Sequence, residues 1–167
     1  DTLSTFFELI HSNGSSKWYM TNRAYKNGTP VTKAPHDDTP YSYAWSYLIL
    51  KRITGDATHC IETKLITHLS ARFSRYIKQG EEWFFFYQIG LHTSLYYHDH
   101  NSTITDGYDI HGGLNYRKRT FRERYESLAK LFYEGSVKKL LKPSFLVYLL
   151  LRLIRLILPN TIIRKNA

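Results

Sequence analysis

The sequence has few of the residues that define several classes of protein. Its 167 residues include one cysteine, Cys60, five prolines and nine glycines. A single cysteine excludes a framework of intrachain disulfides and fits a reducing compartment such as the cytoplasm. Set against 14 tyrosines and 9 phenylalanines, the low proline and glycine content argues against a disordered chain. The length predicts one domain with a sizeable core.

Several motifs of catalysis and binding are also missing. The chain has no nucleophile elbow of a serine hydrolase and no glycine pattern for nucleotide phosphates. It has no zinc-finger or ribonucleoprotein spacing, so nucleic acid ranks low as a partner. The longest apolar run, residues 144–158, is shorter than the roughly 20 residues of a spanning helix and contains two arginines.

Positive charge is abundant and unevenly distributed. The net charge is +9, and residues 113–167 hold 13 basic side chains against 3 acidic ones. This excess predicts an anionic partner for the C-terminal third, either nucleic acid or a lipid surface.

The run 144–158 predicts a helix that lies in the plane of a membrane surface, because apolar side chains combine there with arginines and basic flanks. The expected membrane contacts are Arg152, Arg155, Phe145, Leu149 and Leu156. The alternative is a core or dimer-forming helix with both arginines pointing outward.

Hydrophobic periodicity predicts a chain that contains both strands and helices. Strands are predicted at 18–25 and 93–97, helices at 2–11, 61–73, 81–90, 117–134, 137–141 and 144–158, a turn at Asn27–Gly28, and a polar loop at 101–113.

The stretch Gly80–Phe86 joins two adjacent acids, Glu81 and Glu82, to four aromatic residues that begin at Trp83. A carboxylate held against apolar surface acquires a raised pKa and can serve as a general base. The alternative is an acidic pair at the N-terminus of a buried helix, where the helix dipole favours anions without any catalysis.

A second candidate site is the polar run Tyr96–Ser102. Side chains alternate across a strand, so His98 and His100 are expected to point the same way. They could hold a divalent cation, although magnesium and manganese prefer oxygen ligands. Histidines on a surface strand end are the alternative.

These two motifs together resemble the C-terminal half of the family 2 glycosyltransferases with the GT-A fold, enzymes of bacterial polysaccharide synthesis. Gly80-Glu81-Glu82 is similar to the family's Gly-Glu-Asp motif, and Tyr97-His98-Asp99-His100 to its Tyr-Arg-x-His motif. Asp1–Phe6 resembles the helix after the family's metal-binding Asp-x-Asp. Glu82 stands where the family has Asp, and His98 where Arg is usual. The nucleotide-binding half of the family has no counterpart in the chain.

The resemblance implies an α/β fold in which helices surround a small mixed sheet, with an acceptor-side catalytic part over residues 1–113 and a basic helical extension over 114–167. It also implies an inverting transfer from a nucleotide-sugar donor to a glycan or lipid-linked acceptor, at the inner face of the membrane. Glu82 is then the base, and Glu81 orients it. His98 and His100 lie near the donor phosphates, with His100 as ligand of a magnesium or manganese ion. Trp83, Tyr97 and Asn101 contact substrate, although core packing remains open for Trp83 and Tyr97. An acceptor-side half on its own is also expected to self-associate. The alternative function is a non-catalytic module that binds a membrane surface.

Overall fold

The computed structural model describes residues 17–34, 40–54, 57–74, 82–105 and 120–158, together with Glu8 and Tyr76. Within β4, the side chains of residues 100–105 are not part of this description. Apart from Glu8, the helix expected at 2–11 lies outside the described residues, as do Glu81 and the loop 106–113.

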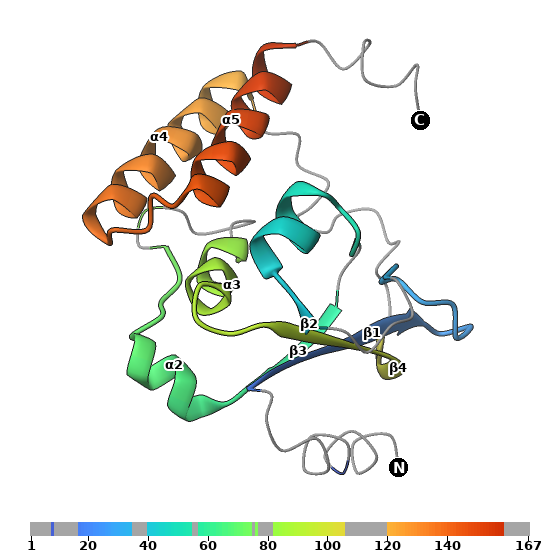
Figure 1. The fold of residues 1–167 in the computed structure, drawn as a ribbon. Coiled ribbons are helices and arrows are strands. Elements are labelled where there is room, and N and C mark those ends of the chain that lie inside the picture. The colour runs from blue at the N-terminus through green and yellow to red at the C-terminus, as the bar shows by residue number, and fades with distance from the viewer. Residues whose placement is uncertain are drawn as a thin grey trace.

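A four-stranded mixed sheet forms the base of the molecule (Figure 1). Its strands are β1 (Trp18–Tyr25), β2 (Pro40–Tyr41), β3 (Ala57–Ile61) and β4 (Leu95–Thr105), in the order β2-β4-β1-β3. The central strands β1 and β4 are parallel, whereas β3 and β2 pair antiparallel to them at the two edges. The expected α/β class with a small mixed sheet is therefore confirmed.

Five helices accompany the sheet in the described part of the chain. They are the π-helix η1 (Tyr43–Ile49) and the α-helices α2 (Thr63–Leu69), α3 (Trp83–Gly90), α4 (Phe121–Val137) and α5 (Pro143–Ile157). In Figure 1, η1 and α3 lie between the sheet and an antiparallel pair formed by α4 and α5. The molecule is thus layered, with α4 and α5 farthest from the sheet.

One aromatic-rich core joins these layers. The ring of Trp18 in β1 stacks on Phe86 of α3, and its Nε1 donates a hydrogen bond of 3.2 Å to His59 Nδ1 in β3. His59 and Phe86 also stack, with ring centroids 4.1 Å apart. The same cluster of buried side chains continues to Leu131 in α4 and Phe145 in α5. The boundary expected at 113/114 therefore does not separate two cores.

The α4–α5 pair packs closely at a glycine. A Cβ atom on Gly135 would lie only 2.7 Å from Phe145 Cε1. Phe145 is fully buried, with ring centroids 5.1 Å from Tyr87 and 6.1 Å from Phe84. Because a larger residue at position 135 would push this ring away, the glycine allows α4 to approach α5.

The start of α4 follows directly from the sequence. The Thr120 hydroxyl accepts from the Glu123 amide, and Glu123 Oε2 accepts from the Thr120 amide at 2.8 Å. This capping box satisfies backbone donors that the first turn leaves unpaired. The break expected between 134 and 137 is wrong, since α4 runs unbroken to Val137, and the chain then turns at Lys139, which has φ 56°.

Two strand segments differ from the sequence-based expectation. Residues 57–61, absent from the prediction, form the edge strand β3, and the helix expected at 61–73 is shortened to 63–69. The polar residues 101–105, expected in a loop, extend β4. In both cases pairing with β1 supplies backbone hydrogen bonds that local residue preference does not reveal.

The helix predicted at 144–158 is confirmed as α5, but its faces differ from the prediction. Phe145 and Leu149, expected to contact a membrane, are buried against the rest of the molecule, so they cannot reach a lipid surface. Leu156 is half-buried, and Arg152 is half-buried with its guanidinium 5.8 Å from the centre of the Tyr148 ring. The exposed apolar side chains of α5 are Leu146, Leu150, Ile154 and Ile157.

None of the helices in the described ranges has the length and apolar character needed to cross a membrane.

Candidate functional site

The central strands carry a hydrogen-bonded network of three polar side chains. The Tyr97 hydroxyl donates to Asn22 Oδ1 at 2.5 Å, and Asn22 Nδ2 donates to Asp99 Oδ1 at 2.5 Å. A carboxylate can only accept, so Asp99 fixes the orientation of the Asn22 amide. Asn22 and Tyr97 are buried, whereas Asp99 is exposed. Two buried groups therefore hold one carboxylate in place at the surface.

This network coincides with an irregularity in the pairing of β1 and β4. Thr21 pairs with His98, but the next residue, Asn22, pairs with Asn101. The residues in between, Asp99 and His100, form a bulge in β4. Bulges redirect side chains and are frequent beside functional sites.

Burial and the neighbouring Asp99 carboxylate raise the pKa of Tyr97 to about 12. Tyr97 therefore keeps its proton at neutral pH and acts as a hydrogen-bond donor. The sequence analysis placed Tyr97 at a substrate site. In the structure it is buried and positions Asn22 and Asp99.

The metal site implied by the resemblance is not formed by the described side chains. They include no group of three or more His, Cys, Asp or Glu residues that could hold an ion. Magnesium demands a nearly octahedral set of oxygen ligands, which the half-buried His98 and the exposed Asp99 do not supply by themselves. Of the other proposed residues, His100 and Asn101 belong to β4, but their side chains lie outside the description.

Glu82 is exposed at the beginning of α3. Its carbonyl oxygen accepts from the amides of Phe85 and Phe86 at 3.0 and 3.3 Å, while its side chain makes no capping hydrogen bond. The pKa of buried Tyr43 is raised by desolvation first, then by Tyr47 and Tyr148, and also by the Glu82 carboxylate. Glu82 is thus open to solvent and directly precedes the aromatic residues of α3.

Trp83, expected to stack on a sugar, is only 8% exposed. Its ring lies edge-on to Tyr148 at 4.5 Å and close to Phe145 at 5.9 Å, so α5 covers it. Trp83 therefore packs in the core, as the alternative to sugar stacking expected, because the first turn of α3 faces α5.

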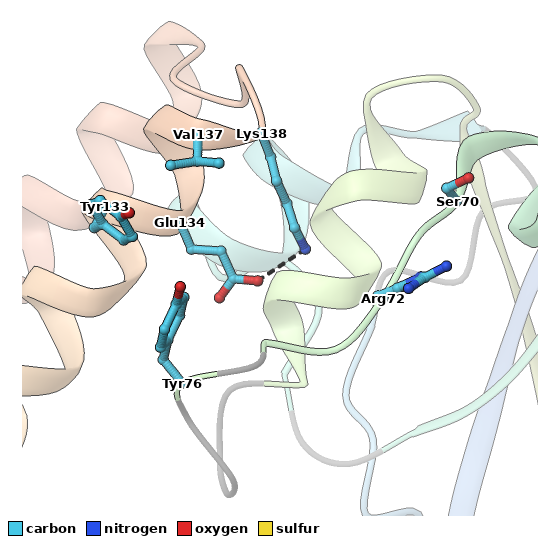
Figure 2. A pocket seen from close by; sticks show the side chains of 7 residues that line it. All are labelled: Ser70, Arg72, Tyr76, Tyr133, Glu134, Val137 and Lys138. Atoms are coloured by element: carbon cyan, nitrogen blue, oxygen red, sulfur yellow. Dashed lines mark ion pairs between the residues drawn. The ribbon is translucent and has the colours of Figure 1, made fainter.

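A pocket of about 340 Å³ lies between α4 and the connector that follows α2 (Figure 2). Its lining combines aromatic, basic and acidic side chains: Ser70, Arg72, Tyr76, Tyr133, Glu134, Val137 and Lys138. Glu134 lies at its centre, where Lys138 Nζ pairs with Glu134 Oε1 at 2.9 Å.

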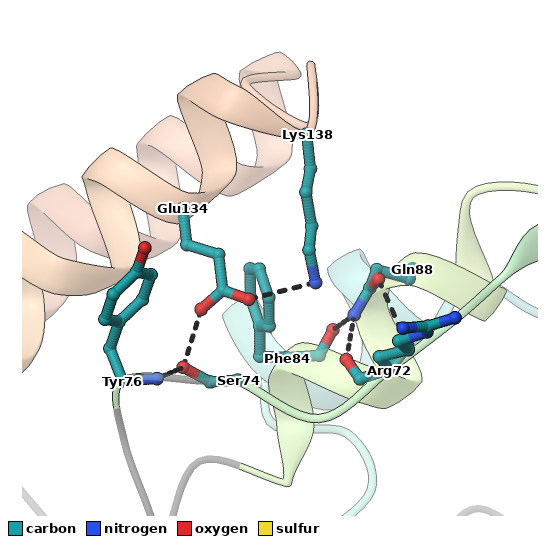
Figure 3. Close-up of polar contacts among 7 residues, drawn as sticks. All are labelled: Arg72, Ser74, Tyr76, Phe84, Gln88, Glu134 and Lys138. Carbon is teal, nitrogen blue, oxygen red and sulfur yellow. Dashed lines mark hydrogen bonds and ion pairs between the residues drawn. The ribbon is translucent and has the colours of Figure 1, made fainter.

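The walls of this pocket are held by further hydrogen bonds (Figure 3). Ser74 Oγ donates to Glu134 Oε2 at 2.6 Å. Gln88 Nε2 of α3 donates to the carbonyl of Arg72 at 2.8 Å and to that of Phe84 at 3.0 Å. Gln88 Oε1 accepts from the Arg72 amide at 3.5 Å. The backbone of Arg72 is therefore fixed by a buried glutamine.

The structure brings together only some of the residues expected at a site. Tyr97, His98 and Asp99 share β4, whereas Trp83 begins α3 and Glu82 is its N-cap residue. Asn22 could not be predicted from the sequence, because 77 residues separate it from Asp99 and no local pattern connects them. Glu134 was not predicted either; its one sequence signal is the lysine four residues later, a spacing that suits an ion pair on a helix.

Comparison with protein-family models, curated proteins and solved structures gives no match for this chain.

Proposed function

We propose that this chain forms the acceptor side of an inverting glycosyltransferase that works at a membrane surface. The observation that supports it is the placement of the two motifs on consecutive elements. Glu82 is exposed at the start of α3, and the next element, β4, presents the exposed Asp99 carboxylate, held by Asn22 and Tyr97. Two outward-facing acids on rigid elements suit the recognition and deprotonation of hydroxyl groups.

In the proposed reaction, Glu82 takes the proton of an acceptor hydroxyl as its oxygen attacks the anomeric carbon of a nucleotide-sugar. The bond from that carbon to the phosphate oxygen breaks, and the nucleoside diphosphate leaves with the electron pair. Asp99 accepts hydrogen bonds from sugar hydroxyls and orients them. His98 and His100 are proposed to lie towards the donor phosphates, with His100 as a metal ligand.

The proposed location is the cytoplasmic face of the membrane, with α5 on the lipid surface. Four exposed aliphatic side chains of α5, spaced three or four residues apart, lie on one face: Leu146, Leu150, Ile154 and Ile157. Lys139 and Lys142 are exposed at the start of this helix, and Arg155 near its end. Apolar and basic side chains together favour a surface that contains anionic lipids.

The proposal is tested by the substitution Glu82→Gln in this protein. We expect about a 100-fold or larger loss of turnover with the fold intact, because the amide cannot accept the acceptor proton. The readout is release of UDP or GDP from a panel of nucleotide-sugars in the presence of bacterial membranes.

Glu62→Gln provides a matched control. Glu62 precedes α2 as Glu82 precedes α3, is also exposed, and makes no capping hydrogen bond. Equal turnover by Glu82→Gln and the wild-type protein would overturn the assignment of the base. A loss shared by both variants would point to a general effect at helix starts instead.

A second candidate function is a non-catalytic module that binds membrane surfaces. The outward apolar face of α5 supports this alternative, because α5 could bind a membrane whether or not Glu82 and Asp99 take part in catalysis. Membrane binding by a protein that shows no transfer with any nucleotide-sugar would favour this alternative.

A further inference from the structure

The pocket between α4 and the 70–76 connector has the chemistry of a small-molecule site that is separate from the proposed transfer reaction. Its volume of about 340 Å³ lies at the lower end of the range for pockets that hold small ligands. Its lining residues come from two segments more than 50 residues apart in the chain, so the site exists only in the folded protein.

The two sides of the pocket differ in chemistry. Tyr76 and Tyr133 lie on one side of the ion pair, with ring centroids 6.0 Å apart in an edge-on arrangement, and Arg72 and Ser70 lie on the other (Figure 2). Both tyrosines are at least half exposed. Aromatic faces of this kind pack against the C–H face of a sugar ring.

The charge of the lining side chains indicates which kind of ligand the pocket could bind. Among the lining side chains, Arg72 and Lys138 are basic and Glu134 is acidic, which leaves one net positive charge. The Glu134 side chain is 3% exposed; its Oε2 accepts from Ser74 and its Oε1 forms the ion pair with Lys138, so the carboxylate is anchored. The buried acid therefore fixes Lys138 and the connector at Ser74, and the basic side chains remain to attract a ligand's charge.

Arg72 is presented by an already ordered backbone. Gln88 holds both the amide and the carbonyl of Arg72, while the side chain of Arg72 is exposed. A guanidinium binds a carboxylate or a phosphate through two parallel hydrogen bonds. The buried amide of Gln88 therefore supports a cation that can bind an anionic group.

We propose that this pocket binds a monosaccharide that carries one anionic group, either a carboxylate or a phosphate. The sugar ring packs against Tyr76 and Tyr133, and the anion pairs with Arg72. The proposal does not depend on turnover, because equilibrium binding tests it even if the transferase assignment fails.

The test is calorimetric titration of the protein with glucuronate and glucose 1-phosphate, beside glucose and inorganic phosphate. We expect both anionic sugars, or one of them, to bind at least tenfold more tightly than glucose or phosphate. Preference between the two identifies the anion as a carboxylate or a phosphate. No binding of either anionic sugar, or equal binding of inorganic phosphate, would overturn the proposal.

Variants locate the binding. Arg72→Ala removes the guanidinium but keeps the backbone contacts with Gln88, and we expect binding of the anionic sugar to weaken about tenfold or more. Tyr133→Ala should weaken binding as well. Arg124→Ala removes an exposed arginine of α4 that does not line the pocket, and it should have no effect. Unchanged affinity in Arg72→Ala would place the ligand elsewhere and contradict the proposal.

Discussion

Asn22 shows how a single buried amide connects two strands. Its oxygen accepts from Tyr97 and its nitrogen donates to Asp99, so each end of the amide has a different partner. An unpaired buried polar group costs about 1–3 kcal/mol, which is why such a residue must satisfy both ends at once. These contacts therefore hold the exposed Asp99 in position before any ligand binds.

The same network predicts a pH dependence of stability. Tyr97 has a pKa of about 12 in the folded protein and about 10 in an unfolded chain. Between these values the unfolded chain loses the proton that the folded protein keeps. The free energy of unfolding should therefore be unaffected below pH 10 and should fall as the pH rises from 10 towards 12.

Tyr97→Phe removes this proton, so its stability should fall less steeply over that window. Urea unfolding at a series of pH values measures the slope. The exposed Tyr125→Phe is the control, and it should match the wild-type slope. Parallel slopes for Tyr97→Phe and the wild-type protein would contradict the raised pKa. A slope remains in every variant, because burial also raises the pKa of Tyr43 and Tyr87.

Among the elements, those that bury a continuous face could be predicted from the sequence. The strand 18–25, the helix 83–90 and the helix 143–157 all match expectation, because each carries a dense set of apolar residues. Residues 57–61 and 101–105 could not be predicted, since their strands depend on pairing with β1. Arg72 and Glu134 likewise gain a shared pocket only when α4 folds against the connector.

The contact between α4 and α5 makes a prediction about Gly135. Alanine normally stabilises a helix interior relative to glycine by about 0.5–1 kcal/mol. At Gly135, however, the added Cβ would lie 2.7 Å from Phe145 Cε1, so we expect Gly135→Ala to destabilise the protein by about 1–3 kcal/mol.

Urea denaturation measures this difference. Ser136→Ala, at the exposed neighbouring position, is the control and should leave stability unchanged or slightly raised. A Gly135→Ala protein as stable as the wild type would show that α5 can shift without loss of packing.

At the scale of the whole molecule, one core extends from the sheet through α3 and η1 to α4 and α5. The basic side chains of α4 and α5 therefore belong to a layer that is packed onto the fold. Because α5 buries Phe145 and Leu149, only its opposite face is available to a membrane.

This arrangement predicts which substitutions affect lipid binding. Leu150→Glu combined with Ile154→Glu places two charges on the outward face of α5, and we expect binding to anionic vesicles to fall about tenfold or more. Ala129→Glu combined with Ser136→Glu adds the same charge to exposed positions of α4, as a control. Vesicle co-sedimentation measures both. Equal vesicle binding by the two double variants would show that α5 is not the docking surface.

Because Trp18 lies in the core and donates a hydrogen bond to His59, its fluorescence can be used to monitor the packing of the core. The Trp18 indole contacts Phe86 of α3 and His59 of β3, so its fluorescence responds to any separation of sheet and helix. Protonation of His59 at Nδ1 would remove the acceptor and alter the emission. With Trp45 and Trp83 replaced by phenylalanine, Trp18 alone would report the packing of the sheet against α3, without an added dye.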